Sequence, residues 1–347
     1  MKKLFIRYAF LLMFSVLLGS FAGSAQNIHF SQYYNAPMLI NPANTGLMPE
    51  YDFRLGLNYR NQWEIIPVPY NTFSGFADCK VGGNKENSNN NWLGVGLAYF
   101  YDIAGSGNLT LSEFQFSSAY HLQTSQHTMF SLGLSGMMAS TTVNYDLLTF
   151  DQQWDGQTFN TQFPNGEKGG VQQAGFYSVA AGFNFAWFPT ESVYFKLGGG
   201  VSNLNKPVVT FYGSKNTLDM RETGNLDMFF HLTPMFTLNP SVYFTTQSGA
   251  MELTAGSLVR TNLSGPYQPV VTQLILGGFM RAGDAAIGVI GFQYANVQFV
   301  ANYDLTISNL APYNDGYGAL EFSLIYQGVY GKNKDRTRKM LGCPRFM

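Results

Sequence analysis

The sequence predicts an all-β fold: a transmembrane antiparallel β-barrel of about 14 strands with a short N-terminal plug or hatch-like segment. Only 12% of the 347 residues are charged, against roughly 25% in soluble proteins, whereas 16% are aromatic and 37 are glycine. Apolar residues recur at every second position in segments of about ten residues, the length that a tilted strand needs to cross a bilayer. The longest apolar run beyond the N-terminus, Ala285–Phe292, is far too short for a spanning helix.

The N-terminus has the three parts of a secretory signal peptide. Lys2, Lys3 and Arg7 provide the charged part, an apolar run follows from Tyr8 to Leu18, and the small residues Gly-Ser-Ala end at Ala25. The alternative is an N-terminal membrane anchor, but the uncharged stretch is shorter than the about 20 residues of a spanning helix. We therefore expect cleavage after Ala25 and export across the inner membrane.

The strand segments alternate between an apolar and a polar face, which is the pattern of a strand with lipid on one side. In 51–60, Tyr, Phe and Leu alternate with Asp, Arg, Gly and Asn, and the segments 92–101, 193–201 and 297–304 behave alike. Segments of this kind are expected at 51–60, 70–81, 92–101, 109–122, 128–138, 173–187, 191–201, 226–236, 240–247, 250–260, 270–281, 285–294, 297–306 and 318–327. An even strand count returns both ends of the barrel to one side of the membrane.

The connections between these segments predict the orientation. The two longest, 139–172 and 202–225, follow odd-numbered strands, whereas tight junctions follow even-numbered strands at 188–190, 237–239 and 295–296. Two connections break the rule, a long one at 82–91 and a short one at 248–249. Outer-membrane barrels have short periplasmic turns and long extracellular loops, so we expect the long connections outside the cell.

Aromatic residues near the strand ends suggest the two interfacial belts of a membrane barrel. Trp92, Trp187 and Phe188 lie at the predicted periplasmic ends, and Tyr59 and Tyr101 lie at the opposite ends. Such rings favour the boundary between lipid and water.

Two segments flank the predicted barrel of 51–328, after the signal peptide of 1–25. Residues 26–50 lack alternation and are dense in Asn, Pro and Gly, so we expect an ordered plug inside the lumen, where polar side chains can satisfy backbone groups. Residues 329–347 form a basic tail that would hang in the periplasm. It is either a solvated end or a docking tail for a periplasmic subunit, and the sequence leaves both open.

The sequence shows no pattern typical of catalysis, and we expect neither an enzyme nor a cofactor. A net charge of -1 disfavours nucleic acid as a partner. The four histidines are not spaced as metal ligands, and no nucleophile elbow stands between a strand and a helix. Cys79 and Cys343 lie far apart in the sequence, and we expect both to be unpaired.

Several stretches in order along the chain resemble one family, the PorP/SprF-type outer-membrane proteins of the type IX secretion and gliding machinery of Bacteroidetes. They are His29–Pro37, Asn41–Gly46, Tyr59–Trp63, Gly199–Pro207, Tyr303–Ser308, Glu321–Leu324 and Cys343–Phe346. One departure is Asn203, where the family pattern leads us to expect a histidine, which puts any role of that imidazole in doubt.

The resemblance implies a non-enzymatic component that binds or anchors secreted cargo, the C-terminal domain of a large adhesin-like protein, at the cell surface. Outer-membrane lipid, this cargo and other subunits of the machinery would be its partners. The plug segment is the expected partner-binding site, through His29, Gln32, Tyr33, Asn35, Asn41, Pro42 and Asn44. The alternative is a passive channel for hydrophobic small molecules, because Asn-Pro-Ala at 41–43 also resembles the hatch of fatty-acid channels.

Overall fold

The structure is a computed structural model that describes residues 28–48, 50–63, 70–82, 91–166, 171–211, 214–264 and 271–330. The predicted signal peptide and most of the predicted basic tail lie outside the described residues, as does Cys343.

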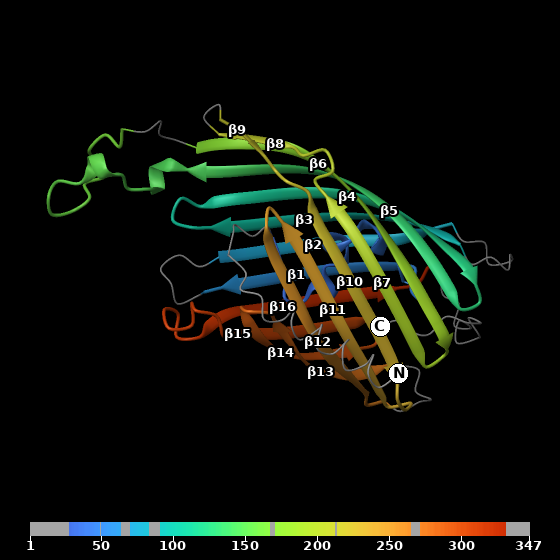
Figure 1. The fold of residues 1–347 in the computed structure, drawn as a ribbon. Helices are drawn as coiled ribbons and strands as arrows, with labels where there is room; N and C mark the ends of the chain where they lie inside the picture. The colour runs from blue at the N-terminus through green and yellow to red at the C-terminus, as the bar shows by residue number, and fades with distance from the viewer. Residues whose placement is uncertain are drawn as a thin grey trace, which may run out of the picture.

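Fourteen antiparallel strands close into a barrel, with β1 paired to both β2 and β16 (Figure 1). The barrel strands are β1 (Phe53–Gln62), β2 (Tyr70–Val81), β3 (Trp92–Ala104), β4 (Leu109–Ser125), β5 (Thr128–Asn144), β6 (Val171–Thr190), β7 (Val193–Ser202), β10 (Arg221–His231), β11 (Phe236–Gln247), β12 (Ala250–Asn262), β13 (Thr272–Arg281), β14 (Ala285–Tyr294), β15 (Val297–Thr306) and β16 (Tyr317–Gly328). A separate hairpin of β8 (Val208–Phe211) and β9 (Ser214–Thr217) lies in the connection from β7 to β10. The predicted fold class and strand number are confirmed.

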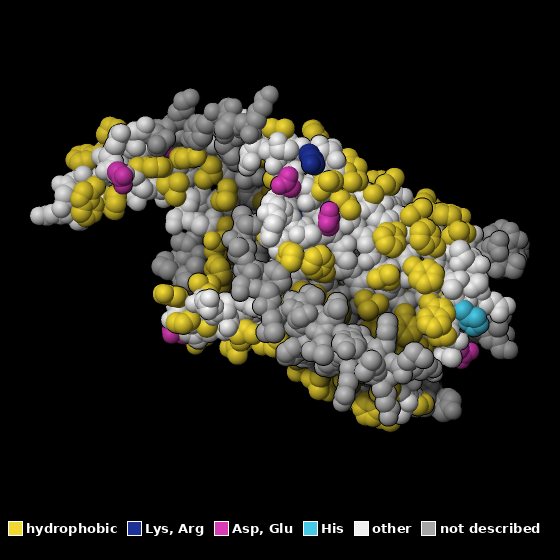
Figure 2. Space-filling view, in the orientation of Figure 1, with side chains coloured by type: hydrophobic (Ala, Val, Ile, Leu, Met, Phe, Trp, Pro, Cys, Tyr) yellow, Lys and Arg dark blue, Asp and Glu magenta, His cyan; other side chains and the backbone are white. Residues whose placement is uncertain are grey.

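The expected alternation between the two faces of the wall is present. On β1, Leu55 and Leu57 are 47% and 61% exposed, whereas Asn58 is 5% exposed and faces inward. Figure 2 shows hydrophobic side chains spread over the outer wall and few charged ones on this side of the molecule. Within the described ranges, none of the helices has the length and apolar character of a membrane span.

The connections differ between the two ends of the barrel. The described parts of the connections after β5 (145–166) and after β7 (203–211 and 214–220) lie at one end, called here the long-loop end. The turns between β6 and β7 and between β14 and β15 lie at the opposite, short-turn end. Figure 1 shows the β5–β6 connection extending well beyond the barrel. It contains two single turns, η3 (Tyr145–Leu147) and η4 (Asp151–Gln153).

The predicted position of the eighth strand is wrong, because the strand begins and ends five residues earlier than predicted. Strand β10 covers Arg221–His231 and not 226–236, and the turn expected at 237–239 is part of β11. Residues 221–225 read Arg-Glu-Thr-Gly-Asn and contain no apolar side chain, so the sequence shows no lipid-facing signal there. Arg221 and Thr223 are buried toward the lumen instead, where polar residues are expected.

The predicted aromatic belt at the short-turn end is wrong for two of its three residues. Trp187 is 45% exposed, but Trp92 and Phe188 are buried inside the barrel with Met129 and Tyr194. Strict alternation explains the difference, because neighbouring residues of a strand face opposite sides. Trp92 precedes the outward Leu93 and Phe188 follows the outward Trp187, so both must point inward.

Candidate partner-binding site in the barrel lumen

Residues 28–48, called here the plug, cross the lumen in three short turns: η1 (Tyr33–Asn35), α2 (Pro37–Ile40) and η2 (Pro42–Asn44). Pro37 and Pro42 begin the second and third turns, where a missing backbone N–H and a fixed φ are favourable. Asn41 caps the third turn by accepting a hydrogen bond from the backbone N–H of Ala43 at 2.9 Å. The local sequence therefore explains the turns themselves.

Glycines in the wall allow the plug backbone to approach closely. A Cβ atom at Gly133 of β5 would lie 2.3 Å from the Ala43 nitrogen, and one at Gly94 of β3 would lie 2.0 Å from the Thr45 carbonyl oxygen. Glycine removes the atom that would clash. The wall is thus shaped for the plug at these positions.

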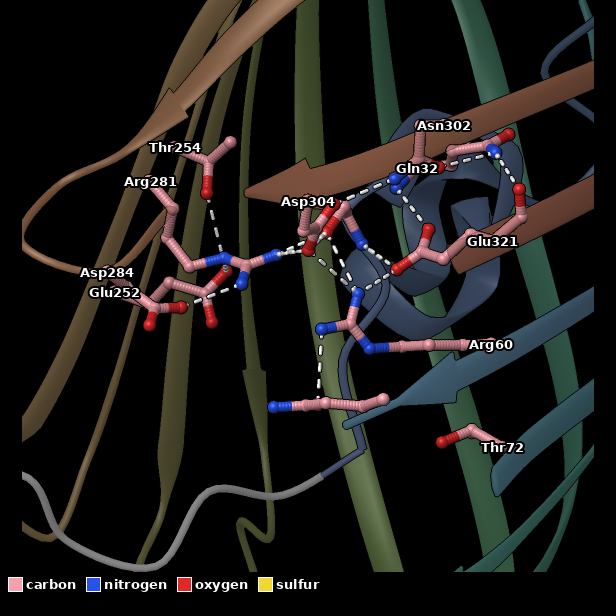
Figure 3. Close-up of polar contacts among 12 residues, drawn as sticks. Gln32, Arg60, Thr72, Glu252, Thr254, Arg281, Asp284, Asn302, Asp304 and Glu321 are labelled. Atoms are coloured by element: carbon pink, nitrogen blue, oxygen red, sulfur yellow. Dashed lines mark hydrogen bonds and ion pairs between the residues drawn. The ribbon is translucent and has the colours of Figure 1, made fainter. Parts of the chain in front are cut away.

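The plug is attached near the long-loop end by Ser31 and Gln32. Figure 3 shows Gln32 beside Asn302 and Glu321. The backbone N–H groups of Ser31 and Gln32 donate to the two carboxylate oxygens of Glu321, at 2.7 and 2.9 Å. The Ser31 hydroxyl donates to Asp304 at 2.6 Å, and the Gln32 amide donates to Asn302 at 2.6 Å. All five residues are at most 3% exposed, so their polar groups are satisfied by protein partners and not by solvent.

Two arginines neutralise the carboxylates beneath the plug. Arg60 and Arg281 each lie 3.1 Å from Asp304, and Arg60 also forms an ion pair with Glu321. Figure 3 shows these side chains pointing toward one another from β1, β13, β15 and β16. Removing one partner from a buried ion pair costs about 3–5 kcal/mol, because the remaining charge is uncompensated. We call Arg60, Arg281, Asp304 and Glu321 the lumen charge cluster.

The middle of the plug packs by aromatic and amide contacts. The Tyr33 ring stacks on Tyr243 with centroids 5.0 Å apart, and its hydroxyl lies 2.6 Å from the Ser241 hydroxyl. The Asn58 amide donates to the backbone carbonyl of Asn35 at 3.2 Å. Gln32 and Asn302 thus pair two side-chain amides across plug and wall, whereas Asn58 meets the plug backbone.

The third turn and the residues after it contact the opposite wall. Asn41 donates to the Phe183 carbonyl at 2.8 Å, and Asn184 donates to the Asn44 side chain at 3.1 Å. The Nε2 atom of His121 lies 2.8 Å from the Thr45 carbonyl oxygen, so this nitrogen carries the proton and donates. Both halves of the plug are therefore held by specific polar contacts.

Cavities lie between the plug and the wall on both sides of the plug. A cavity of about 160 Å³ lies toward the short-turn end, with Arg260, Tyr34 and Lys196 in its lining. A smaller one of about 40 Å³ lies toward the long-loop end. Its lining combines Met38, Leu39 and Pro42 of the plug with wall residues that include Glu113 and Arg221. Across the described ranges, no cluster of three metal-ligating side chains occurs.

The chain matches the family described as Type IX secretion system membrane protein PorP/SprF over residues 22–326. It belongs to the PorP/SprF family. The predicted resemblance is thereby confirmed, and the protein is a membrane component of the type IX secretion system. A comparison with curated proteins finds no match.

Solved outer-membrane channels share the fold of this PorP/SprF-family protein. A deltaS2S3 mutant of the TodX monoaromatic hydrocarbon channel has 9% identity and a TM-score of 0.50, and the match covers 84% of this chain and 93% of that one. The Ralstonia pickettii toluene transporter TbuX has 10% identity and a TM-score of 0.49, with 89% and 96% covered. At these identities the likeness concerns the fold alone. Together with the family, the barrel places the protein in the outer membrane.

The structure buries the predicted partner-binding residues within the lumen. His29 is half-buried, and Gln32, Tyr33, Asn35, Asn41, Pro42 and Asn44 are buried. Gln32, Tyr33 and Asn35 lie together near β1, β11 and β15, whereas Asn41 and Asn44 contact β6 and are separate from them. Pro42 is the one among the seven that lines the cavity toward the long-loop end.

The prediction of site residues missed the lumen charge cluster. Arg60, Asp304 and Glu321 lie in stretches that carried the family resemblance, but the resemblance assigned them no role. A usable signal was present, since each is a charged residue at an inward position of a strand whose outward positions are mostly apolar. Such a charge in a plugged lumen needs a partner.

Proposed function

We propose that this PorP/SprF-family barrel is a non-enzymatic outer-membrane component that binds the C-terminal domain of secreted adhesin-like cargo at the cell surface. The observation that carries the proposal is the occupied lumen. Residues 28–48 cross it and bond to the wall through buried charges and amides, which suits an anchoring protein better than an open pore. The long-loop end faces the cell exterior in this proposal, because extracellular loops are the longer ones in such barrels.

The β5–β6 connection supports a protein-binding role for the long-loop end. Trp154, Phe159 and Phe163 are 48%, 49% and 44% exposed, and the rings of Trp154 and Phe159 are 5.0 Å apart. They lie on the part of the chain that extends beyond the barrel, where Figure 2 also shows hydrophobic side chains. Exposed apolar side chains grouped outside the membrane are typical of surfaces that bind other proteins.

The plug contributes to this proposed site as the floor of the lumen. Met38, Leu39 and Pro42 line the cavity toward the long-loop end and would meet a cargo segment that entered the barrel from that side. Asn41 and Asn44 hold the turn that carries Pro42, through their contacts with β6. The predicted partner-binding residues would then act mainly by positioning this floor.

Two changes test the proposal in cells that export the cargo. Replacing Trp154, Phe159 and Phe163 with serine should release cargo from the surface, and replacing 41–44 with a Gly-Ser linker should do the same while the barrel stays heat-modifiable. The matched control is serine at Leu232 and Leu263, which are 65% and 55% exposed at the short-turn end. Co-purification of cargo with the barrel from mildly solubilised outer membranes is the measurement. Undiminished co-purification from both variants would contradict the proposal.

A passive channel for hydrophobic small molecules remains the alternative, and it makes the opposite prediction. A channel would take up an aromatic hydrocarbon faster when the plug is loosened, and its activity would not depend on the loop aromatics. Uptake that rises in the 41–44 linker variant, with cargo retention intact, would favour the channel.

A further inference from the structure

The larger lumen cavity contains a buried cation without a counterion. Arg260, on β12, is 6% exposed, and one of its terminal nitrogens donates to Gln298 at 3.1 Å. Its Nε atom is buried and has no hydrogen-bond partner among the described residues. No carboxylate in the described part of the chain forms an ion pair with it. A buried guanidinium in this state is unfavourable unless an anion joins it.

The other cations of the same cavity are already paired. Arg54 lies 2.7 Å from Asp78, and Lys196 lies 3.1 Å from Asp227. Of the described cations in the lining, Arg260 is therefore the one with charge left to neutralise.

A second unsatisfied donor lines the cavity. The Tyr34 hydroxyl is buried and has no hydrogen-bond partner among the described residues. A guanidinium and a hydroxyl together present donors for the oxygens of an anion. Apolar side chains complete much of the lining: Ile40, Leu47, Phe76, Tyr194, Phe229 and Ile325.

From these contacts we propose that the cavity binds a small organic monocarboxylate, held by Arg260 and Tyr34. The volume of about 160 Å³ is close to the roughly 150 Å³ of a cavity that holds one benzene ring. A planar carboxylate matches the fork of the guanidinium. A single negative charge neutralises Arg260, whereas Asp227 in the same lining would repel a doubly charged phosphate. The carboxylate belongs either to a free acid or to the C-terminus of a polypeptide.

Calorimetric titration of the full-length barrel in detergent with benzoate tests the proposal, with benzamide as the neutral analogue. We expect benzoate to bind and benzamide to bind roughly tenfold more weakly or not at all. Arg260→Gln should weaken benzoate binding by a similar factor, and Tyr34→Phe by a smaller one. Lys206→Gln is the matched control, because it removes an exposed cation outside this cavity and should change nothing.

Equal binding of benzoate and benzamide would overturn the proposal, as would full benzoate affinity in Arg260→Gln. Heat modifiability shows whether each variant is folded. If Arg260→Gln does not fold, Arg260→Lys takes its place, because it keeps the charge but loses the planar fork. Benzoate affinity that is unchanged in both Arg260→Lys and Tyr34→Phe would then overturn the proposal.

Peptides ending in phenylalanine distinguish the two sources of the carboxylate. Binding of the free but not the amidated peptide assigns a polypeptide end, and binding of benzoate alone assigns a free acid. Both of these results support the site.

Discussion

The two faces of the barrel wall place different demands on the same strands, and β15 shows both. Its outward Phe299 and Tyr303 are 47% and 40% exposed, whereas its inward Asn302 and Asp304 are 2% and 1% exposed and bond to the plug. An outward residue needs only to be apolar, because lipid makes no directional contact with it. An inward residue needs a particular partner, because a buried polar group left unpaired is costly. On the outer face, a substitution should therefore be tolerated when the new side chain is apolar. On the inner face, it should be tolerated only when the polar partners stay paired.

The largest effect is expected inside, at the lumen charge cluster. Glu321→Gln removes one of the two carboxylates that balance Arg60 and weakens the two bonds to the plug backbone. We expect a loss of about 3–5 kcal/mol in the free energy of unfolding, measured by denaturant titration in detergent. Glu191→Gln is the control, because Glu191 is exposed in a turn and should change stability by less than about 0.5 kcal/mol. Similar values for the two variants would refute the cluster's role in stability.

The next effect concerns the outer face. Leu57→Arg places a charge in lipid and should destabilise the barrel by about 2–4 kcal/mol near the bilayer midplane. Gln327→Glu on the inner face of β16 places a charge in the lumen cavity that Arg260 also lines, and should cost much less. Refolding into lipid bilayers at a series of denaturant concentrations measures both. Equal penalties would mean that the outward and inward faces are not distinguished by lipid.

A smaller effect on stability is expected from substituting two glycines of β5. Gly133→Ala puts a Cβ atom 2.3 Å from the plug backbone, and such overpacking costs about 1–3 kcal/mol. Gly136→Ala faces outward and would meet nothing within 4 Å, so it should be close to neutral. The difference between their unfolding midpoints isolates the plug contact from the loss of glycine itself. Identical midpoints would show that the plug backbone can move away from the new Cβ atom without loss of stability.

The last prediction concerns the two ends of the barrel and involves no expected change in stability. In a chain with both native cysteines replaced by serine, Gln157→Cys in the β5–β6 connection should react with an impermeant maleimide on intact cells. Ser192→Cys in the turn between β6 and β7 should react only after the outer membrane is opened. Both side chains are exposed, so accessibility within the protein is matched. The reverse pattern would invert the proposed orientation.

Most of the wall could be predicted from the sequence because the alternation of strand residues is a local property. Leu55, Leu57 and Phe299 face outward as their spacing predicts. The errors arise where this signal is absent or was overridden. The polar run 221–225 contains no apolar residue that would indicate a lipid-facing side. The residue type of Trp92 suggests an interfacial belt, but its position in the alternation turns it inward.

The sequence by itself thus determined the lipid-facing pattern, the number of strands and the turns of the plug, since all of these depend on neighbouring residues. The tertiary structure alone decided which partners meet in the lumen. Arg60 lies 261 residues from Glu321, and they meet because barrel closure sets β1 beside β16. Ser31 lies 273 residues from Asp304, and they meet because the plug lies inside the closed barrel. The plug has no repeat from which its path could be read, so its pairing, and the unpaired charge of Arg260 beside it, appear only when the closed barrel surrounds it.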